Sequence, residues 1–158
     1  MAGADYFLKI EGVAGESTDD QHQGEISLES WSWAETRPDG AGGGAGKVQM
    51  QDFHFVMPVS KASPKLLLAC ASGEHLRSAR LTCRRAGASR QEFLTFTFSD
   101  VRVSAYQTGG PPASDLPPSD QVSLTYGKIE VEYREQRPDG TPGAATKAGW
   151  DLTRNQPL

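Results

Sequence analysis

The sequence predicts a mainly β fold: an antiparallel β-barrel of bent strands with one short flanking α-helix. Three observations support this prediction. Apolar and polar residues alternate along most of the chain, three of the alternating runs change parity partway, and 17 Gly and 10 Pro supply many turns. The 158 residues fit one domain spanning residues 1–158, because a chain of about 150 residues buries roughly 70% of its unfolded surface.

Four runs alternate with period two throughout, which is typical of strands that bury one face. They cover residues 6–10, 79–83, 94–98 and 101–105. In the first run, Leu8 is expected inside and Phe7 outside.

Three longer runs change parity. They are Ile26 and Leu28 followed by Trp31 and Trp33; Val48 and Met50 followed by Phe53, Phe55 and Met57; and Val122, Leu124 and Tyr126 followed by Ile129, Val131 and Tyr133. A one-residue shift turns the inward side chains to the other face, so each break marks a bulge or bend, with Gly127 at the third. Strands that bend and continue join two sheets into a barrel or an orthogonal sandwich, and we predict the barrel.

Residues 63–73 predict the helix. Ser63 is expected to cap it, Pro64 to occupy its first position and Gly73 to end it. The tetrapeptide Arg-Pro-Asp-Gly occurs at 37–40 and again at 137–140, where it predicts tight turns. A Gly-rich loop at 39–47 and a Pro-rich loop at 108–120 are expected between strands.

The charge balance argues against nucleic acid as a partner, because the net charge is -4. No apolar run approaches the roughly 18–20 residues that cross a bilayer, so we expect no membrane insertion. The N-terminus has no basic segment and no apolar signal region, which predicts folding in the cytosol. The clustered arginines 77, 80, 84, 85 and 90 favour contact with an acidic surface on another protein.

The sequence offers no clear catalytic, metal or cofactor site. Gly46-Lys47 is followed by Val48, which departs from the phosphate-binding loop pattern. His22, His54 and His75 lack metal-ligand spacing, and no Ser stands in a nucleophile motif. We therefore expect no catalytic residue, no cofactor and no metal, as in a binding or assembly module.

Two acidic residues and two cysteines each allow two interpretations. Asp19-Asp20 predicts a solvated turn, with a weak cation site as the alternative. Cys70 and Cys83 predict two buried thiols, with a disulfide between them as the alternative.

Seven short segments between Tyr6 and Asn155 carry motifs whose order along the chain is informative. They are 6–10 with 15–17, 30–33, 46–48 with 51–53, 62–64 with 67–70, 106–110, 128–133 and 148–150. In this order they resemble the haemolysin-coregulated proteins (Hcp), tube components of the bacterial type VI secretion system. A Pro-rich loop after Gly110, Pro58 and Cys83 depart from the family pattern.

The resemblance implies a β-barrel flanked by a helix, made in the bacterial cytoplasm and then secreted without a signal peptide. It implies homohexameric rings that stack into a tube inside a contractile sheath and are driven with a spike protein into a neighbouring cell. It also implies that the ring lumen carries and protects small effector proteins. On this basis we expect no enzymatic activity.

Ser32 is the expected effector contact. It must point away from the core if Trp31 and Trp33 face inward, and the resemblance places this strand at the lumen. An exposed serine with no task is the alternative. In the 39–47 loop, Gly42, Gly43, Gly44, Gly46 and Lys47 are expected to order against the adjacent subunit or the next ring.

Two other functions stay open at this point. One is a small-ligand-binding β-barrel without enzymatic activity, and the other is an enzyme, such as a hydrolase, fused into this family's tube.

Overall fold

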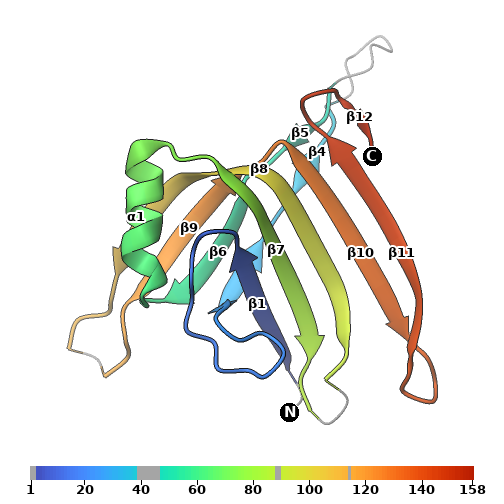
Figure 1. Cartoon of the computed structure of the whole chain (residues 1–158), viewed down its shortest axis with the longest axis horizontal. Coiled ribbons are helices and arrows are strands. Elements are labelled where there is room, and N and C mark those ends of the chain that lie inside the picture. Colours follow the sequence, from blue (N-terminus) through green and yellow to red (C-terminus); the bar gives the residue numbers. More distant parts are fainter. Residues whose placement is uncertain (1–2, 39–46, 88–89, 114) are drawn as a thin grey trace.

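The computed structural model of the protein describes residues 3–38, 47–87, 90–113 and 115–158 (Figure 1). These ranges form one helix and a set of strands that pair antiparallel throughout. The elements are β1 (Ala4–Ile10), β2 (Ile26–Ser27), β3 (Ser30–Ser32), β4 (Glu35–Thr36), β5 (Gln49–Met50), β6 (Phe53–Pro58), α1 (Ala62–Ser72), β7 (Leu76–Arg85), β8 (Glu92–Gly109), β9 (Ser119–Thr125), β10 (Lys128–Gln136), β11 (Pro142–Asp151) and β12 (Gln156–Pro157).

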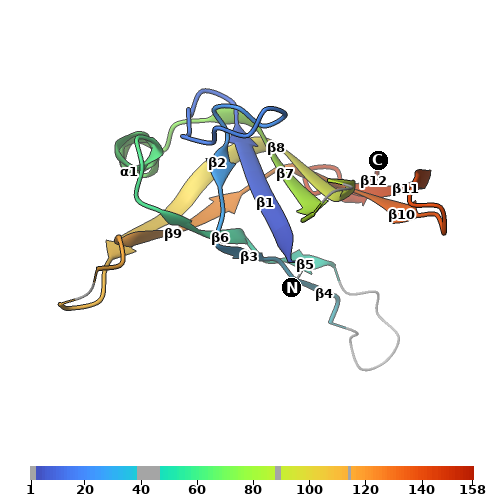
Figure 2. The same ribbon diagram turned by 90° about the horizontal axis from the view of Figure 1, so that it is seen from below.

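Strand β8 belongs to two layers, which Figure 2 shows from below. Its first half pairs with β7 and β10, and its second half pairs with β9. The long layer has the order β12-β11-β10-β8-β7-β1-β2, and the short layer has the order β3-β6-β9-β8. Between the two halves, Asp100 adopts a φ of 56°, a left-handed conformation that re-aims the strand.

The mainly β, antiparallel class with one helix is confirmed, but the barrel is not closed. β2 pairs with β1 in the long layer and β3 pairs with β6 in the short layer. Within the described ranges no ladder joins β2 to β3 or β6. Instead the chain crosses between the layers at Leu28 and Glu29, whose amides donate to the carbonyls of Tyr6 and Val56.

The three parity changes coincide with strand breaks. The chain leaves β2 for β3 after Ser27, β5 for β6 after Met50, and β9 for β10 after Thr125. At the third break, around Gly127, it passes from the short layer to the long layer. A change of parity in the sequence therefore marks a change of layer or ladder here.

Aromatic and aliphatic side chains fill the space between the layers. Phe53, Phe55 and Phe98 are fully buried, and Phe53 and Phe98 lie with ring centroids 4.8 Å apart. Trp31 packs on Phe96, with ring centroids 5.3 Å apart. The interior is thus packed with side chains, as in a core rather than a ligand cavity.

Helix α1 covers one end of this core against β8 (Figure 1). It ends as predicted, because Gly73 adopts a φ of 69° and its amide donates to the carbonyl of Ala69. Its start was predicted wrongly. Ser63 lies within the first turn and donates from Oγ to Asp120 Oδ2 at 2.5 Å, while Ser60 Oγ accepts from the Ala62 amide.

The helix has 11 residues, whereas about 20 are needed to cross a bilayer. No helix in the described ranges is long and apolar enough to span a membrane.

Candidate functional site

Ser32 lies on the outer face of the short layer, as predicted. Its neighbours Trp31 and Trp33 pack against the core, while Ser32 itself is exposed. Along the ladders, Ser32 stands opposite His54, and His54 stands opposite Ser123. His54 is half-buried and stands between the fully buried Phe53 and Phe55.

A hollow of about 510 Å³ surrounds Ser32 on this face. It is lined by Ser32, Trp33, Ala34, Gln51, Asp52, His54 and Ser123. His54 Nδ1 lies 3.1 Å from Ser123 Oγ, and Ser104 donates from Oγ to Asp52 Oδ2 at 2.6 Å. In a Ser-His-Asp relay the carboxylate would instead orient the imidazole. The hollow therefore presents hydroxyl, imidazole and carboxylate groups, and its carboxylate, Asp52, accepts from Ser104.

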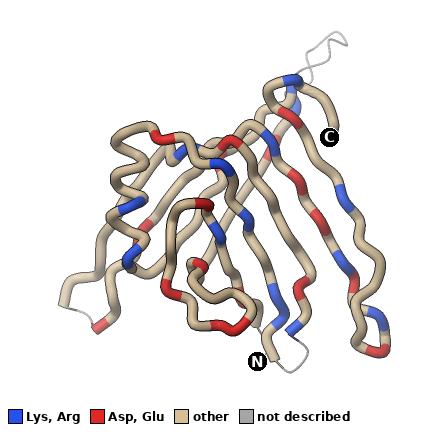
Figure 3. Tube along the Cα trace, in the orientation of Figure 1, with Lys and Arg blue, Asp and Glu red and all other residues tan. Residues whose placement is uncertain are grey.

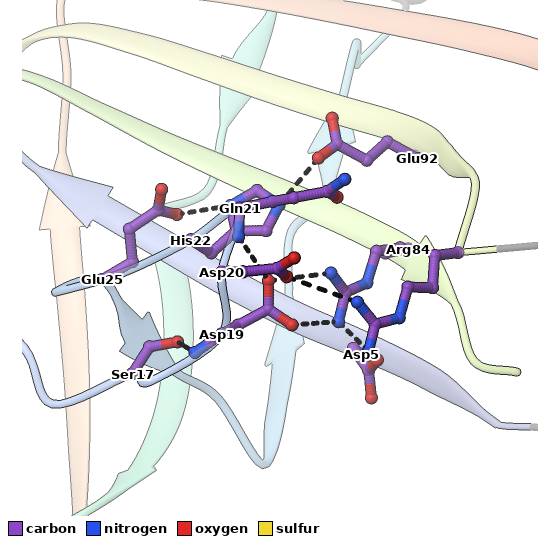
Figure 4. A network of polar contacts seen from close by, with 10 residues as sticks. Asp5, Ser17, Asp19, Asp20, Gln21, His22, Glu25, Arg84 and Glu92 are labelled. Carbon is purple, nitrogen blue, oxygen red and sulfur yellow. Dashed lines mark hydrogen bonds and ion pairs between the residues drawn. The ribbon is translucent and has the colours of Figure 1, made fainter. Parts of the chain in front are cut away.

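Two of the five arginines in the predicted basic patch, Arg84 and Arg90, form ion pairs within the chain, whereas Arg77 and Arg80 are exposed. Arg84 is buried and forms a bidentate ion pair with Asp19, with distances of 2.7 and 3.0 Å, and a further one with Asp5 at 3.1 Å (Figure 4). Arg90 pairs with Asp20 at 3.3 Å. Figure 3 shows acidic positions of the segment 11–25 beside basic positions of β7.

Asp19 is therefore an ion-pair partner of Arg84 rather than a solvated turn residue. Hydrogen bonds from the Arg84 guanidinium hold the pKa of the Asp19 carboxyl well below its usual range, and the same bonds raise the pKa of Arg84. A weak cation site at Asp19-Asp20 was the alternative prediction. The Asp19 carboxylate that would bind the cation is instead paired with Arg84.

Segment 11–25 also covers Phe7, which was predicted to lie outside and is buried. The rings of Phe7 and His22 are stacked with their centroids 4.3 Å apart. The Arg84 guanidinium lies 4.8 Å from the centroid of the Phe7 ring. The buried His22 bridges two carboxylates, with Glu25 at 3.1 Å and Glu92 at 2.7 Å. This cluster attaches the segment to the outer face of the long layer.

The two cysteines are both free, so the disulfide alternative is wrong. Cys83 is buried and Cys70 is half-buried. Burial raises the pKa of the Cys83 thiol to about 12, which keeps it protonated and unreactive.

An apolar groove of about 580 Å³ lies between the β4–β5 hairpin and the β10–β11 pair. Its apolar lining includes Trp33, Val48, Met50, Ile129, Val131 and Trp150. The buried Nε1 of Trp150 has no hydrogen-bond partner in the described part of the chain. Sequence reasoning missed this groove because it assigned Ile129 and Val131 to the barrel interior.

The predicted contact loop is described only at its end. Gly42, Gly43, Gly44 and Gly46 lie outside the described residues. Lys47 is exposed and lies two residues before the start of β5.

Comparison with known proteins gives consistent matches. Residues 7–133 match the profile of a family described as "Type VI secretion system effector, Hcp". The chain is 40% identical over 157 residues to Protein hcp1 of Pseudomonas aeruginosa, covering 96% of each.

Solved structures agree with this match. The crystal structure of Hcp1 from Salmonella typhimurium has a TM-score of 0.83 and 32% identity, covering 100% of both chains. A structure described as a type six secretion system protein has a TM-score of 0.93 and 26% identity, covering 99% of this chain and 100% of that one.

Proposed function

Since this chain belongs to the Hcp family of type VI secretion proteins, we propose that it is the structural subunit of the secretion tube. Six copies form a ring, and rings stack into a tube that is secreted. The observation that carries the proposal is the 40% identity to Protein hcp1 over 96% of both chains, because it extends over every layer of the fold rather than over one motif.

The proposed partners are further copies of the chain, the contractile sheath around the tube, the spike protein at its tip and small effectors in its lumen. The protein is made in the bacterial cytoplasm and leaves through the secretion system without a signal peptide. It has no catalytic activity in this proposal, in line with the Ser32 hollow, where Asp52 accepts a hydrogen bond from Ser104.

Ser32 is the proposed effector contact. Its hollow combines hydroxyl, imidazole and amide groups from Ser32, His54 and Gln51, which suits recognition of varied polar surfaces through hydrogen bonds. The loop containing Gly42, Gly43, Gly44, Gly46 and Lys47 is the proposed contact to the adjacent subunit or the next ring. Ordering such a loop costs about 1–2 kcal/mol per residue in backbone entropy, so stacking is expected to be weaker than ring closure.

The alternative of a small-ligand-binding barrel has less support. Phe53, Phe55 and Phe98 occupy the interior where such a ligand would bind.

Negative-stain electron microscopy of the purified protein tests the proposal. Rings with a central hole are expected, and stacks of rings are expected at higher concentration. Isolated small particles at every concentration would refute it.

A further inference from the structure

The outer face of the short layer carries uncharged side chains in two neighbouring rows. The residues of these rows are exposed or half-buried and alternate along the strands with core residues. Across β3, β6 and β9, the rows are Ser32, His54 and Ser123, and Ser30, Val56 and Gln121. Each row ends on β8 with another uncharged residue. We call these two rows the neutral face, because the described strands place no Lys, Arg, Asp or Glu in them.

Charged residues lie beside the neutral face rather than within it. Glu29 and Asp52 immediately precede β3 and β6, and Arg102 lies at one end of the β8–β9 ladder. Each of the two carboxylates accepts a hydrogen bond from a serine hydroxyl. Ser119 donates from Oγ to Glu29 at 3.3 Å, and Ser104 donates from Oγ to Asp52 at 2.6 Å. The carboxylates at the border are therefore already engaged by neutral donors of the same layer.

The outer face of the long layer, on the opposite side of the molecule, is charged (Figure 2). One row across its ladders runs from Arg80 through Thr97 to Glu130. In the next row, Glu132 stands opposite Lys147. The same chain thus places charges on one sheet face and keeps them off the other, so the neutral face is a local property of the short layer rather than a consequence of the overall composition.

The chemistry of the neutral face determines which partner surface fits it. A charged side chain docked there would lose its water and find no opposite charge in the two rows, which is costly. Serine hydroxyls and glutamine amides both donate and accept hydrogen bonds. Gln121 and Gln107 stand directly opposite each other on β9 and β8, which places two such amides next to each other. The neutral face therefore fits a surface of uncharged polar side chains and backbone amides.

We propose that the neutral face selects effectors that present an uncharged, hydrogen-bonding contact surface, whatever the net charge of the effector. The proposal rests on the carrier function proposed above for Ser32 and adds His54, Gln107 and Gln121 to the contact residues. Salt screens interactions between charges, so it should have little effect on this contact. Each contact is weak, but the same face recurs in every copy of a ring, and linked weak contacts add up to a useful affinity.

The salt dependence of effector binding is the first test. The probe is a purified, labelled small effector of the same secretion system, and its dissociation constant from the full-length ring is measured in about 50 mM and about 500 mM NaCl. The measurements are made at about pH 8, where a free imidazole is neutral. We expect the two dissociation constants to agree within about twofold, because no ion pair contributes to the contact.

A charge placed in the neutral face is the second test. Gln121→Glu and Gln121→Lys should each weaken binding of the same probe by about fivefold or more, because a charge of either sign is desolvated there without a partner. Gln23→Glu and Gln23→Lys are the matched controls, since Gln23 is exposed on segment 11–25, and they should bind like the wild type. Native mass spectrometry verifies that all four variants keep the oligomeric state of the wild type.

Three results would overturn the proposal and leave the carrier function intact. They are a steep loss of wild-type binding at the higher salt concentration, unchanged binding by both Gln121 variants, and tighter binding by either of them, which would reveal an opposite charge on the effector. A wild-type ring that binds the probe at neither salt concentration would overturn the carrier function and this proposal together.

Discussion

Arg84 and Asp19, 65 residues apart in the sequence, form a bidentate ion pair on the outer face of β7. The Arg84 side chain is 5% exposed and that of Asp19 is 15% exposed. The pair holds segment 11–25 against the long layer, together with the stack of His22 on Phe7. Arg84, one of the five arginines of the predicted basic patch, therefore stabilises the subunit.

Replacing Arg84 by methionine should lower the free energy of unfolding by about 3 kcal/mol. Removing one partner of a buried ion pair leaves the other charge uncompensated, which typically costs about 3–5 kcal/mol, and Asp5 and Asp19 keep some contact with water. Urea unfolding at fixed protein concentration measures the change. Arg80→Met is the control, because Arg80 is exposed on the same strand, and its effect should stay within about 0.5 kcal/mol. Similar losses from both variants would show that the ion pair is not the cause.

The stability of the wild-type protein should fall more steeply in acid than that of Asp19→Asn. The pKa of Asp19 is lowered in the folded state, chiefly by hydrogen bonds from Arg84, so the unfolded chain takes up this proton at a higher pH. The ionised Asp19 carboxylate contributes fully to the free energy of unfolding above its unfolded pKa of 3.8. This contribution is lost as the pH falls toward the pKa of Asp19 in the folded protein. Unfolding curves from about pH 5 to pH 2 should therefore converge for the two proteins. Parallel curves would contradict this assignment.

The sequence was most informative where the structure follows local patterns. Alternation located the strands, and the parity changes located the points where the chain changes ladder, as at Gly127. The helix end at Gly73 also follows from local chemistry. The bend of β8 could have been found by the same rule, since buried residues shift parity between Phe98 and Val101, but no glycine marks it.

The site features that were missed depend on distant contacts. Nothing near Phe7 in the sequence indicates that segment 11–25 folds back over it, and no pattern links Arg84 to Asp19. Ser63 has the residue type of a cap, yet a carboxylate 57 residues away, on Asp120, takes its hydroxyl. The barrel stays open because Leu28 and Glu29 pair with different strands, which alternation alone does not specify.

Replacing Ser32 by glutamine should weaken effector binding and leave the oligomer intact. The larger amide side chain fills part of the hollow next to His54 and Ser123, whereas the core contacts of Trp31 and Trp33 are unaffected. Pull-down of an effector of the same secretion system measures binding, with Thr97→Gln in the long layer as the control. Equal recovery of the effector by the Ser32 variant and the wild type would refute the assignment.

Deleting residues 41–45 should shorten tubes without preventing ring formation. If the loop orders against the next ring, its loss removes contacts between rings and spares the contacts within each ring. Tube length in electron micrographs measures the effect, and the ring diameter serves as the internal control. Tubes of unchanged length would exclude the loop from stacking.

The mass of the native particle tests the central claim most directly. If this chain is a ring subunit, native mass spectrometry should give six copies of the 17.0 kDa chain, about 102 kDa. A particle of a single 17.0 kDa chain across the whole concentration range would contradict the account.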